Sequence, residues 1–213
     1  AEELVFYRAS GLGPRQNIGA GQLVPGTHAR DMHELFMRGN FGRYSVFLEA
    51  THLNSPMAAN DQLSTRGASW ALLRYVADRA GAVDGDLWRR LVDGRNTGAA
   101  NLDDALAGTG MTATSALKDW SAAVAVDDLD AAMDPALTQP SWQFSTSMAV
   151  LGYRNGPATF ALLDGQPLSF LVRAGGTVFF VFGVDPGRQA LVQISSGGGV
   201  AQPGMRLTLV RTR

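Results

Sequence analysis

Cysteine is absent from the sequence, and lysine occurs once, as Lys118, among 18 basic residues. Without cysteine the chain can form no disulfide, no thiolate nucleophile and no cysteine-ligated metal site. The absence leaves the cellular compartment open, because cysteine-free chains occur on both sides of a membrane. We interpret the excess of arginine over lysine as codon bias.

Long apolar runs and a strong net charge are also missing. No stretch approaches the roughly 18 consecutive apolar residues of a membrane-spanning helix, so we expect no membrane span. The formal net charge is -1, which provides no field to collect nucleic acid or anionic lipid, and we expect neither as a partner. A length of 213 residues allows one or two domains with their own cores.

No complete catalytic or metal-binding motif is present. His33-Glu34 begins like the zinc-binding motif HExxH, but Met37 stands where that motif needs its second histidine. The aspartates of residues 127–134 lack the loop spacing of a calcium site. The glycine-rich stretch 11–26 is not followed by Gly-Lys-Ser/Thr, and no Gly-x-Ser-x-Gly elbow occurs. We therefore expect no metal or cofactor site built from this chain alone.

The first part of the sequence, up to about residue 134, has helical periodicity. In the segment 61–80, apolar or small residues recur at three- and four-residue steps: Leu63, Gly67, Trp70, Leu73, Val76, Ala77 and Ala80. Asp61 or Ser64 is a candidate cap for the start of this helix, and Gly81 suits its end. Further helices are predicted at residues 1–8, within 29–39 and 42–49, and at 84–94, 101–108 and 114–124.

After Pro135 the apolar pattern changes to a period of two, which is typical of strands with one buried face. The alternating residues lie within 142–150, 168–172, 178–184, 190–194 and 205–209. Turn-forming sequences such as Asn155-Gly156-Pro157 and Asp185-Pro186-Gly187 separate several of these segments. Five or six short strands at this spacing predict a small antiparallel sandwich.

We therefore predict an α+β protein of two domains. An all-α helical lobe is expected over residues 1–134, and a small antiparallel β-sandwich over residues 140–213. The acidic, proline-flanked stretch 127–140 is the predicted boundary.

The first residues predict a helix whose start is unusual. Ala1-Glu2-Glu3-Leu4 leads directly into apolar residues, and no Ser, Thr, Asp or Asn precedes them to cap the free amide groups. No initiator methionine is present. We expect this chain to be part of a longer protein.

Several segments together resemble the C-terminal portion of gluzincin-type zinc metallopeptidases, in particular the hyicolysin-like bacterial proteins. Ala1–Leu4 resembles the helix that follows the family's Asn-Glu-Gly segment, which supplies the third zinc ligand. Leu63–Trp70 resembles a later family helix with a Gly-Ala pair. Leu87–Leu91 and Leu117–Trp120 are similar to small helices of the catalytic lobe, and Ser169–Arg211 resembles the β-modules appended to secreted bacterial peptidases.

The resemblance implies where the chemistry would lie. The family holds zinc with two histidines and a glutamate, and all of these residues would precede Ala1. Glu2 or Glu3 would then orient a zinc-bound histidine, or would simply lie on the helix surface. Ser64 stands where many members carry an oxyanion-stabilising tyrosine. Arg66 is the candidate replacement as a cationic donor, or else belongs to an ordinary helix.

Two hypotheses about function follow. In the first, the chain is the C-terminal part of a secreted or cell-surface zinc peptidase that acts on peptides or proteins. It would support the active site, would need an N-terminal catalytic lobe as its partner, and would be inactive and free of zinc alone. In the alternative, the chain is a noncatalytic binding or structural module that attaches through its β-domain.

Overall fold

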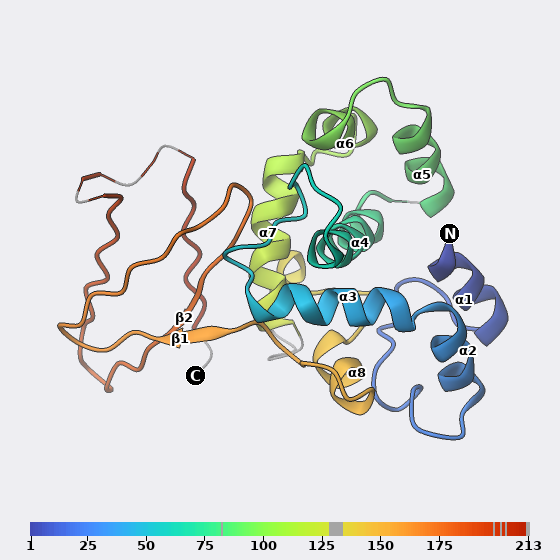
Figure 1. Ribbon diagram of the computed structural model, residues 1–213, viewed down its shortest axis with the longest axis horizontal. Coiled ribbons are helices and arrows are strands. Elements are labelled where there is room, and N and C mark those ends of the chain that lie inside the picture. The colour runs from blue at the N-terminus through green and yellow to red at the C-terminus, as the bar shows by residue number, and fades with distance from the viewer. Residues whose placement is uncertain (82, 128–133, 198, 201, 203, 212–213) are drawn as a thin grey trace.

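The structure is a computed structural model that describes residues 1–81, 83–127, 134–197, 199–200, 202 and 204–211. A helical body carries a long C-terminal segment that extends away from it (Figure 1). The helices are α1 (Glu2–Ser10), α2 (His28–Phe36), α3 (Arg38–Glu49), α4 (Leu63–Arg79), α5 (Asp84–Asp93), α6 (Gly98–Ala105), α7 (Ala113–Val126), the short 3-10 helix η1 (Pro135–Leu137) and α8 (Phe144–Val150). The strands are β1 (Thr159–Ala161) and β2 (Phe179–Val181).

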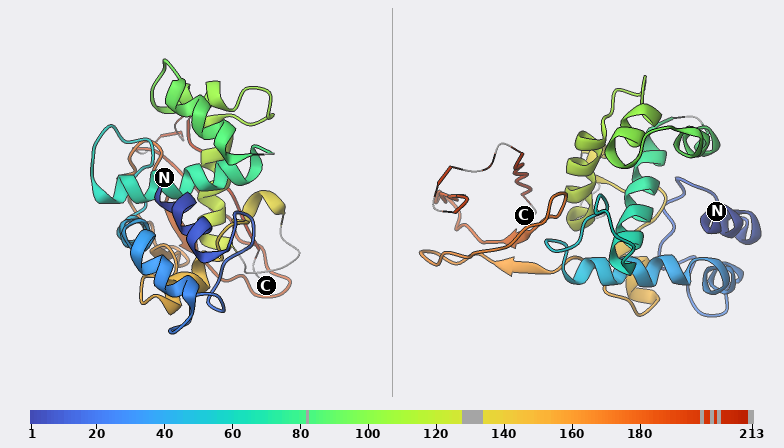
Figure 2. Two further views of the ribbon diagram at one scale, coloured as in Figure 1. Left: turned by 90° about the vertical axis from the view of Figure 1, so that its right-hand side faces the viewer. Right: turned by 45° about the horizontal axis from the view of Figure 1, so that its top comes forward.

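Helix α4 is the central element of the helical body. It packs against α3, α5 and α7, and these neighbours surround it in both views of Figure 2. The apolar stripe of residues 61–80 correctly predicted this helix, but the predicted cap is wrong. Gln62 is the N-cap residue and makes no side-chain capping bond, while Asp61 pairs with Arg66 instead.

A cluster of aromatic rings connects α1, α3 and the residues at the start of α8. The ring of Trp142 lies 5.3 Å from that of Phe6 on α1 and 4.9 Å from that of Phe41 on α3. Phe41 also contacts Phe144 at the start of α8, with 5.8 Å between ring centroids. Trp142, Phe6 and Phe41 are fully buried. Burial of three large rings provides a substantial part of the apolar contact that holds α1, α3 and α8 together.

The predicted antiparallel β-sandwich is wrong. The protein is mostly helical, and its described residues form two short strands that pair in parallel, with Thr159 opposite Phe179. The first predicted strand lies in the region of α8, whose buried residues Phe144 and Met148 are four positions apart and share one helix face. The helical body therefore extends through Val150.

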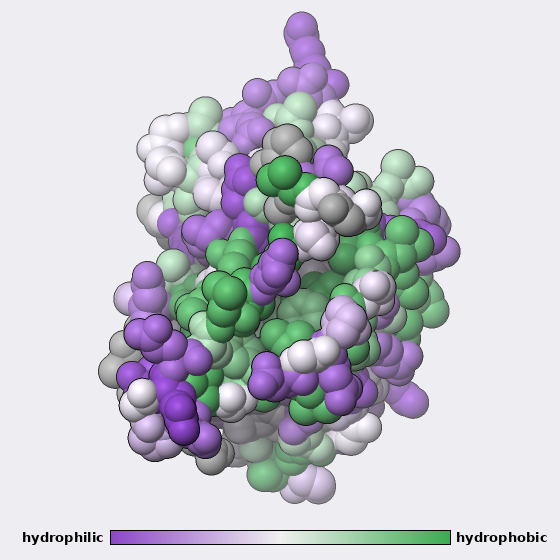
Figure 3. All heavy atoms as spheres, turned by 90° about the vertical axis from the view of Figure 1, so that its left-hand side faces the viewer, coloured by the Kyte–Doolittle hydropathy of each residue, from purple (hydrophilic) through white to green (hydrophobic). Residues whose placement is uncertain are grey.

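Of the remaining predicted strands, the segment 178–184 contains β2, and within the described residues the other three contain no strand. Alternation predicts that one set of side chains is covered by a second layer. In the described C-terminal residues no such layer covers them, because the alternating residues are 38–75% exposed: Leu168, Val172, Val192, Ile194, Met205, Leu207 and Leu209. Figure 3 shows apolar residues gathered around a hollow on this side of the molecule. Within the described residues, no helix is long and apolar enough to cross a membrane.

Helices α3 and α4 approach each other closely at Gly67. A Cβ atom added to Gly67 on α4 would overlap backbone atoms of Arg43 and Tyr44 on α3. Backbone atoms of a packed helix cannot move aside as a flexible side chain can. The contact between α3 and α4 therefore requires a glycine at this position.

We predict that Gly67→Ala lowers the free energy of unfolding by about 3 kcal/mol, the upper range for overpacking of a core. Gly42→Ala on α3 is the matched control, because its added Cβ would meet nothing closer than the Tyr153 ring at 3.9 Å. The control is expected to be neutral or to stabilise by about 0.5–1 kcal/mol. Urea denaturation measures both changes, and equal stabilities for the two variants would contradict the packing argument.

Candidate functional site

Glu3, one of the residues singled out from the sequence, is a buried carboxylate in the first turn of α1. It is 8% exposed. Its Oε1 accepts hydrogen bonds from Trp142 Nε1 at 2.7 Å and from Tyr7 Oη at 3.2 Å. Its Oε2 lies 3.5 Å from Nη1 of Arg74. Burial raises the pKa of this carboxyl above its usual range, and the charge of Arg74 and the two hydrogen bonds oppose the shift.

Arg74 is the centre of this group of charges. Its side chain is 2% exposed, with Nη1 donating to Asp84 Oδ2 at 2.6 Å and Nη2 lying 2.8 Å from Asp78 Oδ1. Burial by itself lowers the pKa of the guanidinium. The hydrogen bond to Asp84 and the charges of Glu3 and Asp78 outweigh that effect and raise the pKa overall. Arg74 therefore stays protonated, and its single positive charge offsets part of the negative charge of the carboxylates from α1, α4 and α5.

A second layer connects these charges to the loops. Asp78 accepts hydrogen bonds from the backbone nitrogen and the hydroxyl of Ser141, at 2.9 and 2.6 Å. Arg15 Nη1 donates to Asp84 at 3.0 Å, and its backbone nitrogen donates to the Ser141 hydroxyl at 2.9 Å. We call Glu3, Arg15, Arg74, Asp78 and Asp84 the Arg74 network.

The Arg74 network does not fit a metal ion. A cation already occupies the centre of its carboxylates, and a second one would be repelled by it. Within the described part of the chain, no group of three or more His, Asp or Glu residues is arranged to hold a metal. The network can fix the direction of α1 relative to α4 and α5, which is a positioning role.

The other two candidate residues lie outside the network. Glu2 is exposed on α1. Arg66 lies near the start of α4, and its Nε donates to Asp61 Oδ1 at 2.6 Å in an exposed ion pair. Ser64, at the position of the family tyrosine, donates to Asn54 Oδ1 at 2.9 Å. The structure thus brings Glu3 to Arg74 and pairs Arg66 with Asp61.

His33 is fully buried among aromatic rings. Its ring lies 4.7 Å from that of Phe41 and 6.5 Å from that of Phe6, both edge-on. Neither ring nitrogen has a hydrogen-bond partner. Burial, with a smaller contribution from the charge of Arg30, lowers the pKa of His33 to about 4. The histidine is therefore a neutral core residue at pH 7.

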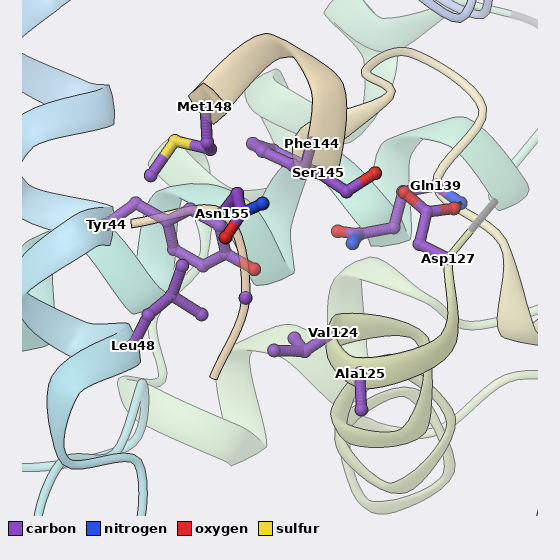
Figure 4. Close-up of a pocket in the computed structure, with 11 residues that line it drawn as sticks. Tyr44, Leu48, Val124, Ala125, Asp127, Gln139, Phe144, Ser145, Met148 and Asn155 are labelled. Carbon is purple, nitrogen blue, oxygen red and sulfur yellow. Dashed lines mark hydrogen bonds between the residues drawn. The ribbon is translucent and has the colours of Figure 1, made fainter. Parts of the chain in front are cut away.

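A pocket of about 240 Å³ opens between α3, α7 and α8 (Figure 4). Its lining comprises Tyr44, Leu48, Val124, Ala125, Asp127, Gln139, Phe144, Ser145, Met148, Asn155 and Gly156. The Gln139 side chain points toward Tyr44 and Asn155 across the pocket. Burial and the charge of Asp127 raise the pKa of the Tyr44 hydroxyl, while the neighbouring Gln139 amide opposes that shift.

Arg74 and the pocket residues are functional candidates that the sequence reasoning missed. Arg74 falls three to four residues from Trp70 and Ala77, on the buried stripe of α4, and Asp78 follows one turn later. A charged residue at a core position of a helix is a usable signal for a buried ion pair. The pocket has no such signal, because its residues come from separate helices and loops.

Comparisons of the chain with protein-family models, with curated proteins and with solved structures found no match. The assignment of a function therefore rests on the residues, their geometry and the resemblance described above.

We predict that Arg74→Met lowers the free energy of unfolding by about 3–5 kcal/mol at pH 7, because it leaves Glu3 and Asp78 buried without a cation and Asp84 paired only with Arg15. Glu3 and Asp78 already have raised pKa values, so they take up protons as the pH falls. Protonation removes their charge, and the deficit of the variant should shrink between pH 7 and pH 5. Denaturant titrations of both proteins at pH 7 and pH 5 measure this difference in the free energy of unfolding.

Arg66→Met is the control on the same helix. The pair of Arg66 with Asp61 is exposed to solvent, so its loss should leave stability unchanged within error. A deficit of Arg74→Met no larger than that of Arg66→Met, or one that does not change with pH, would show that the buried network contributes little.

His33 should make the stability of the protein depend on pH. Its pKa is about 4 in the folded state and 6.5 in the unfolded chain, so the unfolded state binds the additional proton between these values. Stability contributed by the neutral ring is complete above pH 6.5 and is lost as the pH falls toward 4, by about 3 kcal/mol in all.

The variant His33→Phe isolates this effect, because a phenyl ring suits the surroundings of Phe6 and Phe41 and carries no titratable group. We expect the wild type to lose about 3 kcal/mol more than the variant between pH 7 and pH 4. Chemical denaturation across that range provides the measurement. Parallel stability curves for the two proteins would contradict the assignment.

Proposed function

We propose that this chain is the C-terminal part of a secreted or cell-surface zinc-dependent peptidase that acts on peptides or proteins. In this proposal its helices support an active site whose metal ligands lie outside the 213 residues. The proposal starts from the resemblance of Ala1–Leu4 and Leu63–Trp70 to gluzincin helices. The partner is the N-terminal catalytic lobe that carries those ligands.

The observation that carries the proposal is the anchoring of Glu3. The resemblance puts the third zinc ligand immediately before α1, so the direction of the first turn of α1 would determine where that ligand points. Glu3 in this turn is tied to Trp142, Tyr7 and Arg74. A metal ligand requires such support, because small changes in its orientation reduce metal affinity and activity.

The exposed side of α1 is consistent with a neighbouring lobe. Leu4 and Val5 are 42% and 45% exposed, while Glu3, Phe6 and Tyr7 on the other side of the helix are buried. An apolar strip on a helix of this kind is a candidate contact surface. In the proposed peptidase it would pack against the catalytic lobe.

Arg66 has a weaker claim to a role in the reaction. Its guanidinium is exposed and is paired with Asp61. It could donate to a developing negative charge only after that pair opens. Glu3, with both of its oxygens engaged, is a positioning residue in this proposal.

A noncatalytic binding module is the second candidate. The specific observation that favours it is the exposed apolar surface of the described C-terminal residues, which surrounds the hollow in Figure 3. Surfaces of this kind often mark contacts with other proteins. This candidate requires no metal and predicts no chelator-sensitive activity in any form of the protein.

The first test is to read the residues encoded before Ala1. HExxH followed by Asn-Glu-Gly within about 150 residues, the usual size of one domain, supports the peptidase proposal. Absence of both motifs would reject it. The 213-residue chain alone is expected to bind no stoichiometric zinc and to cleave no casein. Chelator-sensitive cleavage by this chain alone would contradict the division of roles.

The role of Glu3 can be measured in the longer protein. We predict that Glu3→Ala lowers zinc affinity and casein cleavage by about 10–100-fold, the usual range for residues that orient a metal ligand. Glu3→Gln retains an acceptor for Trp142 and Tyr7 and should recover part of the loss. Glu2→Ala, at an exposed position on the same turn, is the control and should behave as the wild type.

Zinc affinity is measured by competition with a chromophoric chelator and the fold by circular dichroism. A Glu3→Ala protein that is folded and binds zinc as tightly as the wild type would show that Glu3 has only a structural role.

A further inference from the structure

We propose that the pocket between α3, α7 and α8 binds a neutral amide, such as one residue of a peptide-like ligand, through the side chain of Gln139. This site is separate from the Arg74 network and does not depend on the proposed peptidase function. Its residues come from α3, α7, α8 and the adjoining loops.

The side chain of Gln139 is buried and makes no hydrogen bond of normal geometry, although it lies close enough to the Tyr44 hydroxyl to oppose the rise of that group's pKa. The residue is 3% exposed, and neither Nε2 nor Oε1 has a hydrogen-bond partner. Buried amides are nearly always paired in folded proteins, because removing both of their polar atoms from water without compensation is costly. A ligand that supplies one acceptor and one donor would remove that cost.

The position of Gln139 is fixed by its backbone. Its amide nitrogen donates to Asp127 Oδ1 at 2.7 Å, and both atoms of that bond are buried. The side chain extends from this anchor toward Tyr44 and Asn155. The backbone bond fixes where the side chain begins, and burial restricts its rotamers, which lowers the entropy cost of binding.

The chemistry of the lining selects a neutral ligand. Gln139 offers an N–H donor and a C=O acceptor side by side. A primary amide, or the N–H and C=O of one extended residue, presents the complementary pair, so two parallel hydrogen bonds can form. No Arg, Lys or His is among the lining residues, and Asp127 contributes a carboxylate. An anion would meet no cationic side chain here and would be repelled by Asp127.

The walls and the volume set the size of the ligand. Leu48, Val124 and Met148 provide apolar walls, to which an aliphatic side chain can pack. The volume is about 240 Å³, somewhat larger than an apolar cavity of about 150 Å³ that holds benzene. Most sites for drug-sized molecules are larger. One residue with a branched aliphatic side chain and its flanking amides has a suitable size.

The test uses the full chain and N-acetyl-L-leucinamide as the probe. We expect saturable binding with a dissociation constant of about 1 mM, which is typical for a ligand of this size. Binding is followed by NMR chemical-shift changes, which should map to α3, α7 and α8. N-acetyl-L-leucine carries a carboxylate in place of the terminal amide, and it should bind at least about tenfold more weakly.

Gln139→Met tests the role of the carboxamide. Methionine has nearly the same shape, and the backbone bond to Asp127 does not depend on the side chain. We expect the variant to lose probe binding by at least about tenfold and to have a higher melting temperature than the wild type, since it removes a buried unpaired amide. Gln62→Met, at an exposed position, is the control and should change neither property.

Three results would overturn the proposal. The first is the absence of saturable chemical-shift changes at a probe concentration of about ten times the expected dissociation constant. The second is equal binding of the amide and the carboxylate probes. The third is unchanged probe binding by Gln139→Met. The first would indicate that no amide ligand pairs with Gln139. If Gln139→Met does not fold, Gln139→Glu replaces it. The difference in affinity of the wild type for the two probes still tests the proposal. None of these readouts depends on peptidase activity.

Discussion

The ion pairs of Arg74 are the interaction on which the arrangement of the helices depends. A single buried guanidinium joins carboxylates from α1, α4 and α5. Because a buried charge without a partner is very costly, these helices cannot separate without exposing the network to water or leaving charges unpaired. Ser141 and Trp142 connect the same charges to the segment before α8. The aromatic core packs beside these ion pairs, which connect α1, α4 and α5.

The sequence predicted the helical part of the fold well, because its apolar residues recur at helical spacing and glycine or proline separates the segments. It failed where a period of two and a period of four coincide. Phe144 and Met148 satisfy both, and only the burial of that face against Phe41 and Trp142 decides for a helix. Within the described C-terminal residues, alternation alone did not produce a sandwich, since a sheet face needs a second layer to cover it.

The candidate sites were predictable to a lesser degree. Glu3 was selected by resemblance, and nothing in its local sequence indicates that it is buried. Its burial depends on Trp142 and Arg74, which are distant in sequence. The burial of Gln139 could not be predicted for the same reason, because a glutamine in a polar loop is normally exposed to solvent. Tertiary contacts, which periodicity does not encode, determine whether a polar side chain is exposed, paired or unpaired.

Three buried polar side chains in this protein have different consequences because their surroundings differ. Arg74 has charged partners, so its burial holds helices together. His33 has no partner for either ring nitrogen and is enclosed by phenyl rings, so the cost of charging it appears as a dependence of stability on pH. Gln139 also lacks partners, but it borders a pocket. In our proposal a ligand in that pocket pairs with the carboxamide, and the cost of its burial in the free protein then becomes part of the affinity.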